Sequence, residues 1–81
     1  MNKEIEKRIG NNIRNIRENR KMTQDEFAAK LQVMGCDITR SSIAKIEVGQ
    51  RHLYPDEILL IKEILHTEFD EIFYGEKGET I

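Results

Sequence analysis

The strongest chemical signal in this chain is a group of hydrogen-bonding side chains on one side of a predicted short helix, residues 40–48. At about 100° per residue, this helix turns Ile43 and Ile46 one way and three donors the other way: Arg40, Ser41 and Lys45. Arginine and lysine donate to guanine O6 and N7, serine donates or accepts, and the small Ala44 lets the backbone come close. A major groove about 12 Å wide accepts such a helix. The pattern therefore predicts hydrogen bonding to base edges of double-stranded DNA.

The other reactive residue types form no catalytic or metal-binding pattern in the sequence. Cys36, His52 and His66 match no zinc-ligand spacing, since the two histidines are fourteen residues apart. Glu47 and His52 come closest to an acid–base pair, but the sequence places no nucleophile beside a base, no carboxylate pair at a plausible site and no glycine-rich phosphate loop. We therefore expect no enzyme activity and no metal, cofactor or small-molecule ligand.

The first two helices have clear signals in the sequence. Four isoleucines at spacings of four, four and three predict one apolar stripe on a helix over about residues 3–20: Ile5, Ile9, Ile13 and Ile16. The stretch from Thr23 to Glu26 has the pattern of a capping box, and Met22 and Phe27 can supply a hydrophobic staple. A second helix is therefore expected over about residues 23–34, closed by Gly35 in the left-handed conformation.

Three further helices complete the expected fold. Thr39 is the N-cap of the third helix, which Gly49 ends. Pro55 or Asp56 begins a fourth helix that is apolar nearly all round, so we expect it to be the central and most buried one. A last short helix is predicted over about residues 70–74. The fold class is therefore all-α, with five helices in a compact arrangement.

Length and composition favour one small cytoplasmic domain. The 81 residues fit a single core, predicted over residues 1–75, with a polar tail at residues 76–81 that frays. One cysteine allows no internal disulfide, which fits a reducing compartment. The N-terminus is charged without an apolar stretch, and the longest apolar run, residues 58–61, cannot span a bilayer. We therefore expect a protein that is neither exported nor membrane-bound.

The charge is distributed unevenly along the chain. The formal net charge is −2, which by itself argues against a nucleic-acid partner. Residues 1–54, however, hold eleven Lys and Arg against seven Asp and Glu, a net of +4, whereas residues 55–81 hold two against eight, a net of −6. The basic part is a separate half of the chain, so the net charge does not decide whether the chain binds nucleic acid. The motifs must decide it.

Taken together, these residues resemble the phage-repressor-like helix-turn-helix domains, also called XRE-like or Cro/repressor-like. The match runs from Ile9 to Phe73 and rests on four groups of residues: Ile9, Ile13, Ile16 and Arg17; Met22 to Ala28; Ser41 to Ile43 with Ile46 to Gly49; and Phe69 to Phe73. Each group alone is weak, but the combination is highly specific. The resemblance implies a five-helix lambda-repressor-like DNA-binding domain that regulates transcription, with repression as the expected outcome.

The resemblance also implies roles for individual residues. The base-reading positions correspond to Arg40, Ser41 and Lys45. The phosphate-binding positions correspond to Thr23, Gln24, Thr39, Gln50 and Arg51, where Thr39 could also reach a base. Arg17 and Glu47 resemble an ion pair that ties the first helix to the third.

Two departures from the family pattern affect the expected geometry. Between Leu31 and Ile43 the chain has about five more residues than usual, which we place as an extra turn of the second helix, residues 32–34, and a longer link. The resemblance therefore identifies the third helix as the one that enters the groove, but it does not set the angle of that helix. His66 stands where the family often has a glycine after the fourth helix, so that turn is expected to differ.

A homodimer is the expected assembly, because one small module buries little surface on DNA. It would read a pseudo-palindromic site whose half-sites lie one helical turn apart. Phe69, Phe73 and Tyr74 stand where such domains commonly form a dimer seam. Packing in the core is the alternative for these three aromatic residues.

Two alternatives to DNA recognition stay open. Lysines and arginines on an exposed helix are often only a solvated face. The same fold can also serve as a protein-interaction module, antitoxin-like or anti-repressor-like, that binds through its acidic C-terminal half. Arg40 and Lys45 discriminate between these hypotheses, because only DNA recognition requires them.

Overall fold

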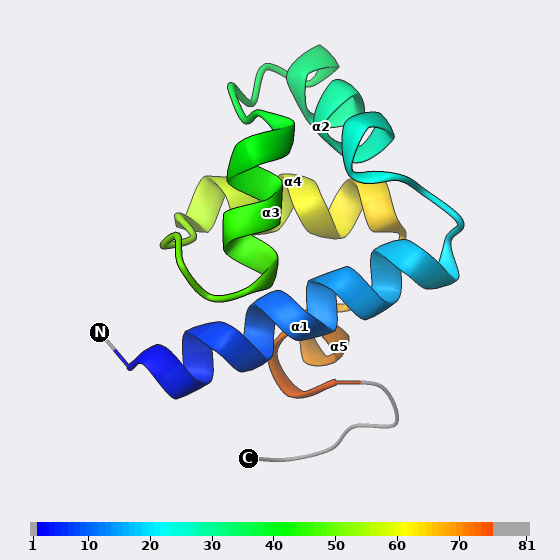
Figure 1. The fold of residues 1–81 in the computed structure, drawn as a ribbon. Helices are drawn as coiled ribbons and strands as arrows, with labels where there is room; N and C mark the ends of the chain where they lie inside the picture. The colour runs from blue at the N-terminus through cyan, green and yellow to red at the C-terminus, as the bar shows by residue number, and fades with distance from the viewer. Residues whose placement is uncertain (1, 76–81) are drawn as a thin grey trace.

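The structure, a computed structural model, describes residues 2–75 and folds them into five α-helices and no strands (Figure 1). The helices are α1 (Lys3–Asn19), α2 (Gln24–Val33), α3 (Arg40–Glu47), α4 (Pro55–Leu65) and α5 (Phe69–Tyr74). The predicted all-α class is confirmed. None of these five helices is long and apolar enough to cross a membrane. The predicted polar tail, residues 76–81, lies outside the described residues.

The capping signals predicted from the sequence begin α2 and α3. The hydroxyl of Thr23 accepts from the Glu26 amide at 3.0 Å, and the Glu26 carboxylate accepts from the Thr23 amide at 2.8 Å, so the capping box is confirmed. The hydroxyl of Thr39 accepts from the Ser42 amide at 3.1 Å. Each cap satisfies an amide that the helix itself leaves unpaired, which fixes where α2 and α3 begin.

Helices α1 to α4 are each followed by one residue in the left-handed conformation. Gly35 and Gly49 take this role after α2 and α3, as predicted, with φ of 86° and 78°. Lys21 and His66 take it after α1 and α4, with φ of 58° and 51°, although neither is a glycine. The turn at His66 therefore keeps the conformation that a glycine would adopt there and carries a backbone strain that glycine would not.

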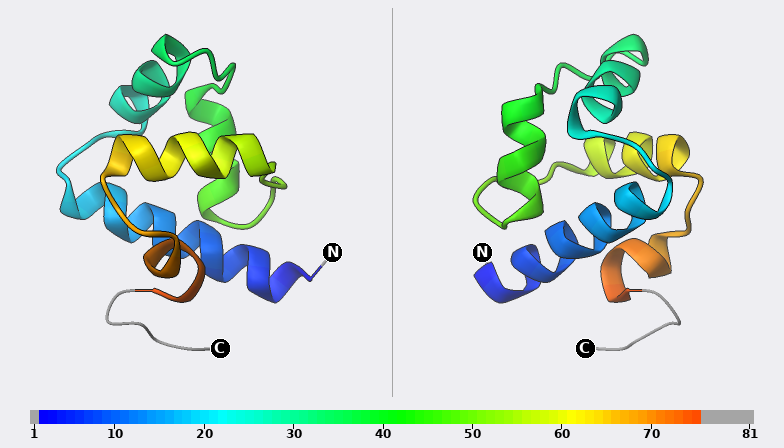
Figure 2. Two further views of the ribbon diagram at one scale, coloured as in Figure 1. Left: turned by 180° about the vertical axis from the view of Figure 1, so that it is seen from behind. Right: turned by 45° about the vertical axis from the view of Figure 1, so that its right-hand side comes forward.

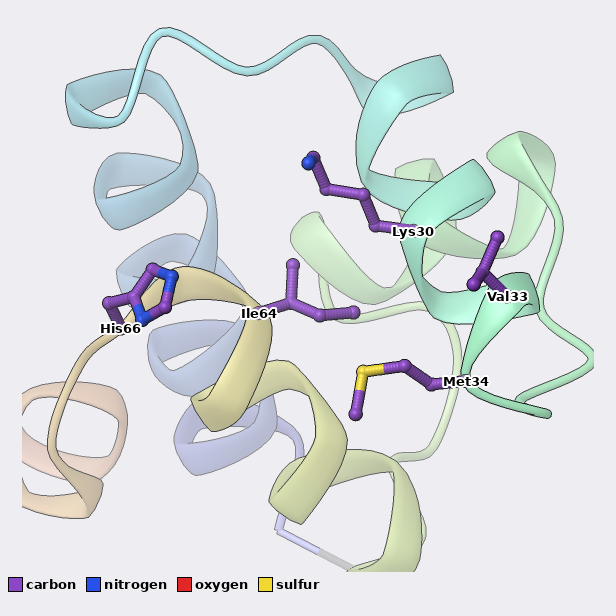
Figure 3. Close-up of a pocket in the computed structure, with 5 residues that line it drawn as sticks. All are labelled: Lys30, Val33, Met34, Ile64 and His66. Atoms are coloured by element: carbon purple, nitrogen blue, oxygen red, sulfur yellow. The ribbon is translucent and has the colours of Figure 1, made fainter.

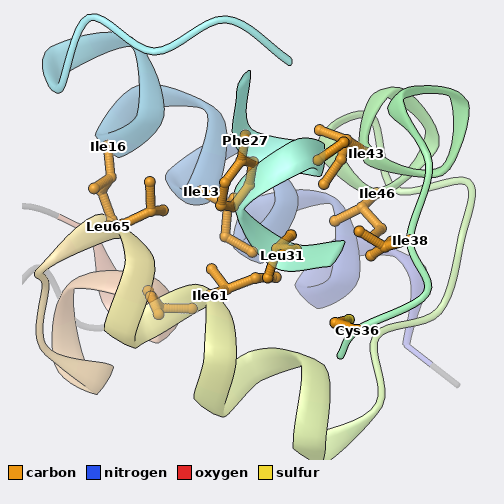
Figure 4. Packing of buried hydrophobic residues seen from close by; sticks show 12 residues of the cluster. Ile13, Ile16, Phe27, Leu31, Cys36, Ile38, Ile43, Ile46, Ile61 and Leu65 are labelled. Carbon is orange, nitrogen blue, oxygen red and sulfur yellow. The ribbon is translucent and has the colours of Figure 1, made fainter. Parts of the chain in front are cut away.

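The core is formed by aliphatic side chains from all five helices and one buried phenylalanine (Figure 4). Helix α1 packs against α3 and α5, and α2 packs against α3 and α4. The isoleucine stripe of α1 is buried at Ile13 and Ile16, is partly covered at Ile9 and is exposed at Ile5, near the free end of the helix. Ile38, in the link before α3, is also fully buried and anchors that link.

A close backbone contact fixes the crossing of α1 and α3. Gly10 is buried in α1, and a Cβ atom built on it would lie 2.0 Å from the carbonyl oxygen of Ile46 in α3. Any side chain at this position would therefore force the two helices apart. This glycine was not singled out in the sequence, because the need for a residue without a side chain comes from Ile46, which is far away along the chain.

The prediction that α4 is the most buried helix is wrong. Only Glu57, Ile61 and Leu65 of α4 are buried, and Leu59 is 49 % exposed. The physical reason is that α2 is the helix with which α4 makes its main contact, so one side of α4 remains uncovered. In the view from behind, α4 lies across the front of the molecule (Figure 2, left). The exposed apolar side chain of α4, Leu59, is therefore part of the surface of the domain.

Candidate nucleic-acid interface

Helix α3 presents the predicted polar face to solvent. Arg40, Ser41 and Lys45 are all exposed, Ala44 is half-buried, and the opposite side of the helix is buried at Ile43 and Ile46. In the right-hand view of Figure 2, α3 lies at one edge of the molecule. No other described element covers its exposed side, so a groove of DNA could reach these side chains.

A buried ion pair fixes α3 from behind. Arg17 in α1 donates from Nε to Oε2 of Glu47 at 2.7 Å and from Nη2 to Oε1 at 3.1 Å. The third donor of this guanidinium bonds the carbonyl of Met22 at 2.7 Å. Gln24, the first residue of α2, donates from Nε2 to Oε1 of Glu47 at 3.0 Å. One carboxylate at the end of α3 therefore joins α1, α2 and α3, which sets the angle at which α3 is presented.

Arg40, the first residue of α3, has a neighbour of opposite charge in α2. Its Nε lies 3.8 Å from Oδ1 of Asp25 in the first turn of α2, and both side chains are mostly exposed. An exposed pair of this kind contributes about 0–1 kcal/mol. Arg40 is therefore held only weakly and can exchange this contact for a stronger acceptor.

The predicted phosphate-binding residues lie at the start of α2, at the N-cap of α3 and in the loop after α3, and they differ in how many hydrogen bonds they already make. Thr23 and Thr39 are exposed and use their hydroxyl oxygens as caps. Gln24 is half-buried and bonds Glu47, which leaves the second hydrogen of its amide group for another acceptor. Gln50 is exposed, and its backbone amide closes the turn after α3 by donating to the carbonyl of Lys45 at 2.8 Å.

Arg51 is the most strongly engaged of these candidates. Its Nη1 and Nη2 each donate to one oxygen of Glu57 at 2.9 Å, and Nη1 also donates to the carbonyl of His52. This bidentate hydrogen bonding raises the pKa of Arg51 and, together with the Tyr54 amide, lowers the pKa of Glu57 against the opposing effect of burial. The pair holds the loop between α3 and α4 against the start of α4.

Some residues that shape this surface were not identified from the sequence. Arg20 was not singled out in the sequence, but it donates to the carbonyls of Leu65 and His66 at 2.8 and 3.0 Å and so closes the C-terminal end of α4. Asp25 was read only as part of a capping pattern. Of Arg20 and Asp25, only Asp25 had a signal in the sequence. Its place in the first turn of α2 of a helix-turn-helix puts it near the start of α3, where Arg40 lies.

The remaining reactive groups do not assemble into a second chemical site in residues 2–75. No three His, Cys, Asp or Glu residues in this range are grouped to hold a metal ion. Cys36 is buried in the link between α2 and α3, and burial raises the pKa of its thiol.

An open groove of about 440 Å³ lies between the C-terminal parts of α2 and α4, lined by Lys30, Val33, Met34, Ile64 and His66, with α3 behind it (Figure 3).

The aromatic residues at the end of the chain lie at the surface. Phe69 is 39 % and Tyr74 40 % exposed, while Phe73 is half-buried and stacks on Phe69 with ring centroids 6.3 Å apart. Ile72 is the fully buried residue of α5. Helix α5 therefore anchors itself through Ile72 and leaves much of its aromatic surface uncovered.

Comparison with known proteins assigns the family. The helix-turn-helix family matches residues 13–72, which is more than half of the chain and runs from α1 into α5 through the whole α2–α3 unit. No curated protein and no solved structure matches the chain. The matched family is one of DNA-binding domains rather than of enzymes. With the α2–α3 unit and the exposed face of α3 described above, the chain belongs to the XRE-type, Cro/repressor-like helix-turn-helix family.

Proposed function

We propose that this protein is a sequence-specific transcriptional repressor that inserts α3 into the major groove of double-stranded DNA. The observation that carries the proposal is the exposure of Arg40, Ser41 and Lys45 on a helix whose other side is buried and locked by Glu47. Arg40 and Lys45 would donate to guanine O6 and N7, and Ser41 would donate or accept at a neighbouring base edge. Repression needs only that the bound protein covers its site.

Phosphate contacts on either side of α3 would fix its register in the groove. Gln24 has one amide hydrogen left for a phosphate oxygen and stands at the N-terminal end of α2, where backbone amides favour anions. On the other side, Gln50 is exposed, and Arg51 uses three N–H donations on Glu57 and His52 out of the five that a guanidinium has. We assign Thr23 and Thr39 to the margins of the same two strands.

We further propose that two copies bind together through α5. Phe69, Phe73 and Tyr74 supply an aromatic patch with incomplete cover, and the exposed Leu59 adds to the uncovered apolar surface of the C-terminal half. A twofold contact of this kind would present two α3 helices at a fixed spacing, which is what reading half-sites one helical turn apart requires. A reducing cytoplasm suits this protein, because its buried thiol at Cys36 is free.

The experiment that tests the proposal begins with selection of bound sites from random duplexes. The wild-type protein should return a pseudo-palindromic site. With that duplex at fixed salt, Arg40→Ala and Lys45→Ala should each weaken binding by about 5- to 150-fold, which corresponds to 1–3 kcal/mol, and should relax base preference at one position each. Gln24→Ala should weaken binding to all duplexes alike.

The control is Lys30→Ala, which removes an exposed positive charge from the side of α2 that faces the groove shared with α4. Lys30→Ala should leave site preference unchanged. If Arg40→Ala and Lys45→Ala bind as the wild type does, or if no duplex is enriched, DNA recognition by α3 is refuted. The protein-interaction hypothesis would then take its place.

A further inference from the structure

The first turns of α1 lie directly against the end of α3. A Cβ atom built on Gly49, the residue that closes α3, would lie 2.8 Å from Cα and 2.9 Å from Cβ of Lys7. The side chain of Lys7 therefore starts at the turn that follows α3, the recognition helix of the proposed function. Lys3, Lys7 and Gly10 stand at helical spacings of four and three, so Lys3 continues the same side of α1 beyond the end of α3.

A second contact holds this part of α1 to the loop after α3. Nδ1 of His52 lies 3.0 Å from Oε2 of Glu6, and Glu6 itself is mostly covered. Together with the close packing at Gly10 and Gly49, this contact connects α1 to α3 and its following loop at three residues of α1, Glu6, Lys7 and Gly10, which lie within about one turn. The position of Lys7 relative to α3 is therefore set by rigid helices rather than by a loop.

The N-terminal end of α1 shares the face on which α3 is presented. In the right-hand view of Figure 2, this end of α1 and the whole of α3 lie at the same edge of the molecule. Both Lys3 and Lys7 are exposed, and no salt bridge among residues 2–75 involves either of them. By contrast, Arg14, Arg17 and Arg51 each bind a carboxylate within the domain.

We infer that Lys7, assisted by Lys3, binds the phosphate backbone of the DNA strand that passes the C-terminal end of α3. This inference rests on the proposed insertion of α3 into the major groove. A helix in that groove lies between two phosphate backbones, and a lysine beside its C-terminal end faces one of them. Lysine binds phosphate as a compact charge on a flexible stem, so it needs no fixed hydrogen-bond geometry.

The contact positions the recognition helix without reading sequence. Gln24 at the start of α2 would grip one strand, and Lys7 would grip the other strand near Gln50. Because a phosphate carries no sequence information, losing Lys7 should lower affinity for every duplex by the same factor. This behaviour separates Lys7 from Arg40 and Lys45, whose loss should change base preference.

The test is the salt dependence of binding, measured by fluorescence anisotropy with the selected duplex and with a scrambled duplex. Each phosphate contact adds about 0.9 to the slope of log affinity against log salt. Lys7→Gln should lower the magnitude of that slope by about 0.9 on both duplexes. The ratio of the wild-type affinity to the Lys7→Gln affinity should therefore fall by about 3.5-fold when the salt concentration rises fourfold. Adding Lys3→Gln should lower the slope further, and Lys7→Arg should restore it. Lys30→Gln, which removes the same charge beside the groove of Figure 3, should leave the slope unchanged.

Three results would overturn the inference while leaving α3 recognition intact. They are an unchanged slope in Lys7→Gln, a loss confined to the selected duplex, and an equal loss of slope in Lys30→Gln. A wild-type protein that binds neither duplex would instead refute the proposed function itself, and the phosphate contact with it. Thermal unfolding of each variant confirms that the exposed substitutions leave the fold intact.

Discussion

Removing the carboxylate of Glu47 should destabilise the domain more than removal of any exposed charge. Glu47 is 4 % and Arg17 7 % exposed, and three donor groups from α1 and α2 converge on the two carboxylate oxygens. In Glu47→Ala, the guanidinium of Arg17 keeps its hydrogen bond to the carbonyl of Met22 and a long contact of 3.9 Å to the half-exposed carboxylate of Glu18, but it loses its buried partner. An uncompensated buried charge of this kind costs about 3–5 kcal/mol.

That loss is a large part of the stability that a domain of this size has. At about 0.05–0.15 kcal/mol per residue, 81 residues give roughly 4–12 kcal/mol. Urea denaturation followed by far-UV circular dichroism measures the free energy of unfolding of Glu47→Ala, Arg17→Met and the double variant Arg17→Met/Glu47→Ala. The double variant should lose less than the sum of the single losses, because it buries no unpaired charge.

The reasoning is refuted by a loss below about 1 kcal/mol in Glu47→Ala, which is the range of an exposed pair, or by additive losses in the double variant. Arg14→Ala is the matched control, since Arg14 and Glu18 form an exposed pair at 3.3 Å in α1. It should change the free energy of unfolding by less than about 1 kcal/mol.

Three further outcomes follow from the structure. Gly10→Ala should lower the free energy of unfolding by about 3 kcal/mol, because its Cβ would collide with the carbonyl of Ile46; a loss below about 1 kcal/mol in urea denaturation would contradict that crossing. His66→Gly should raise the thermal midpoint through a gain of about 0.5–1 kcal/mol, because glycine relieves the left-handed φ of 51°; an unchanged or lower midpoint would contradict this. The lowered pKa of Glu57 means that the unfolded state binds more protons, so stability is full above the unfolded pKa of about 4.3 and falls as pH drops below it. Glu57→Gln should flatten this acid loss in a pH series of urea denaturations, and an unchanged pH profile would count against the Arg51 contact.

The local parts of the fold were predictable because their signals lie within a few residues of one another. The box at Thr23 and Glu26, the cap at Thr39 and the glycines after α2 and α3 each need only neighbours in sequence, and the structure places them as predicted. The exposed face of α3 was predictable for the same reason, since helical periodicity alone separates Arg40 and Lys45 from Ile43.

The parts that were missed depend on contacts between distant segments. Gly10 matters because α3 crosses α1 there, and Arg20 closes α4 because the end of α1 lies beside it. Periodicity could not show that α4 has one uncovered side, because an apolar side chain gives the same signal in a core and on an unpartnered surface. The pairing of Arg51 with Glu57 likewise depends on how the loop after α3 folds back.

The most direct test of the central claim, that the exposed side of α3 contacts base edges, combines one protein change with one DNA change. In the selected duplex, each guanine is replaced in turn by 7-deazaguanine, which removes the N7 acceptor and leaves the phosphates untouched. At one guanine this replacement should weaken binding of the wild type by about 5-fold or more and leave binding of Arg40→Ala unchanged, and a second guanine should behave in the same way with Lys45→Ala. Equal losses in the wild type and in both variants at every guanine would contradict base contact by these two side chains.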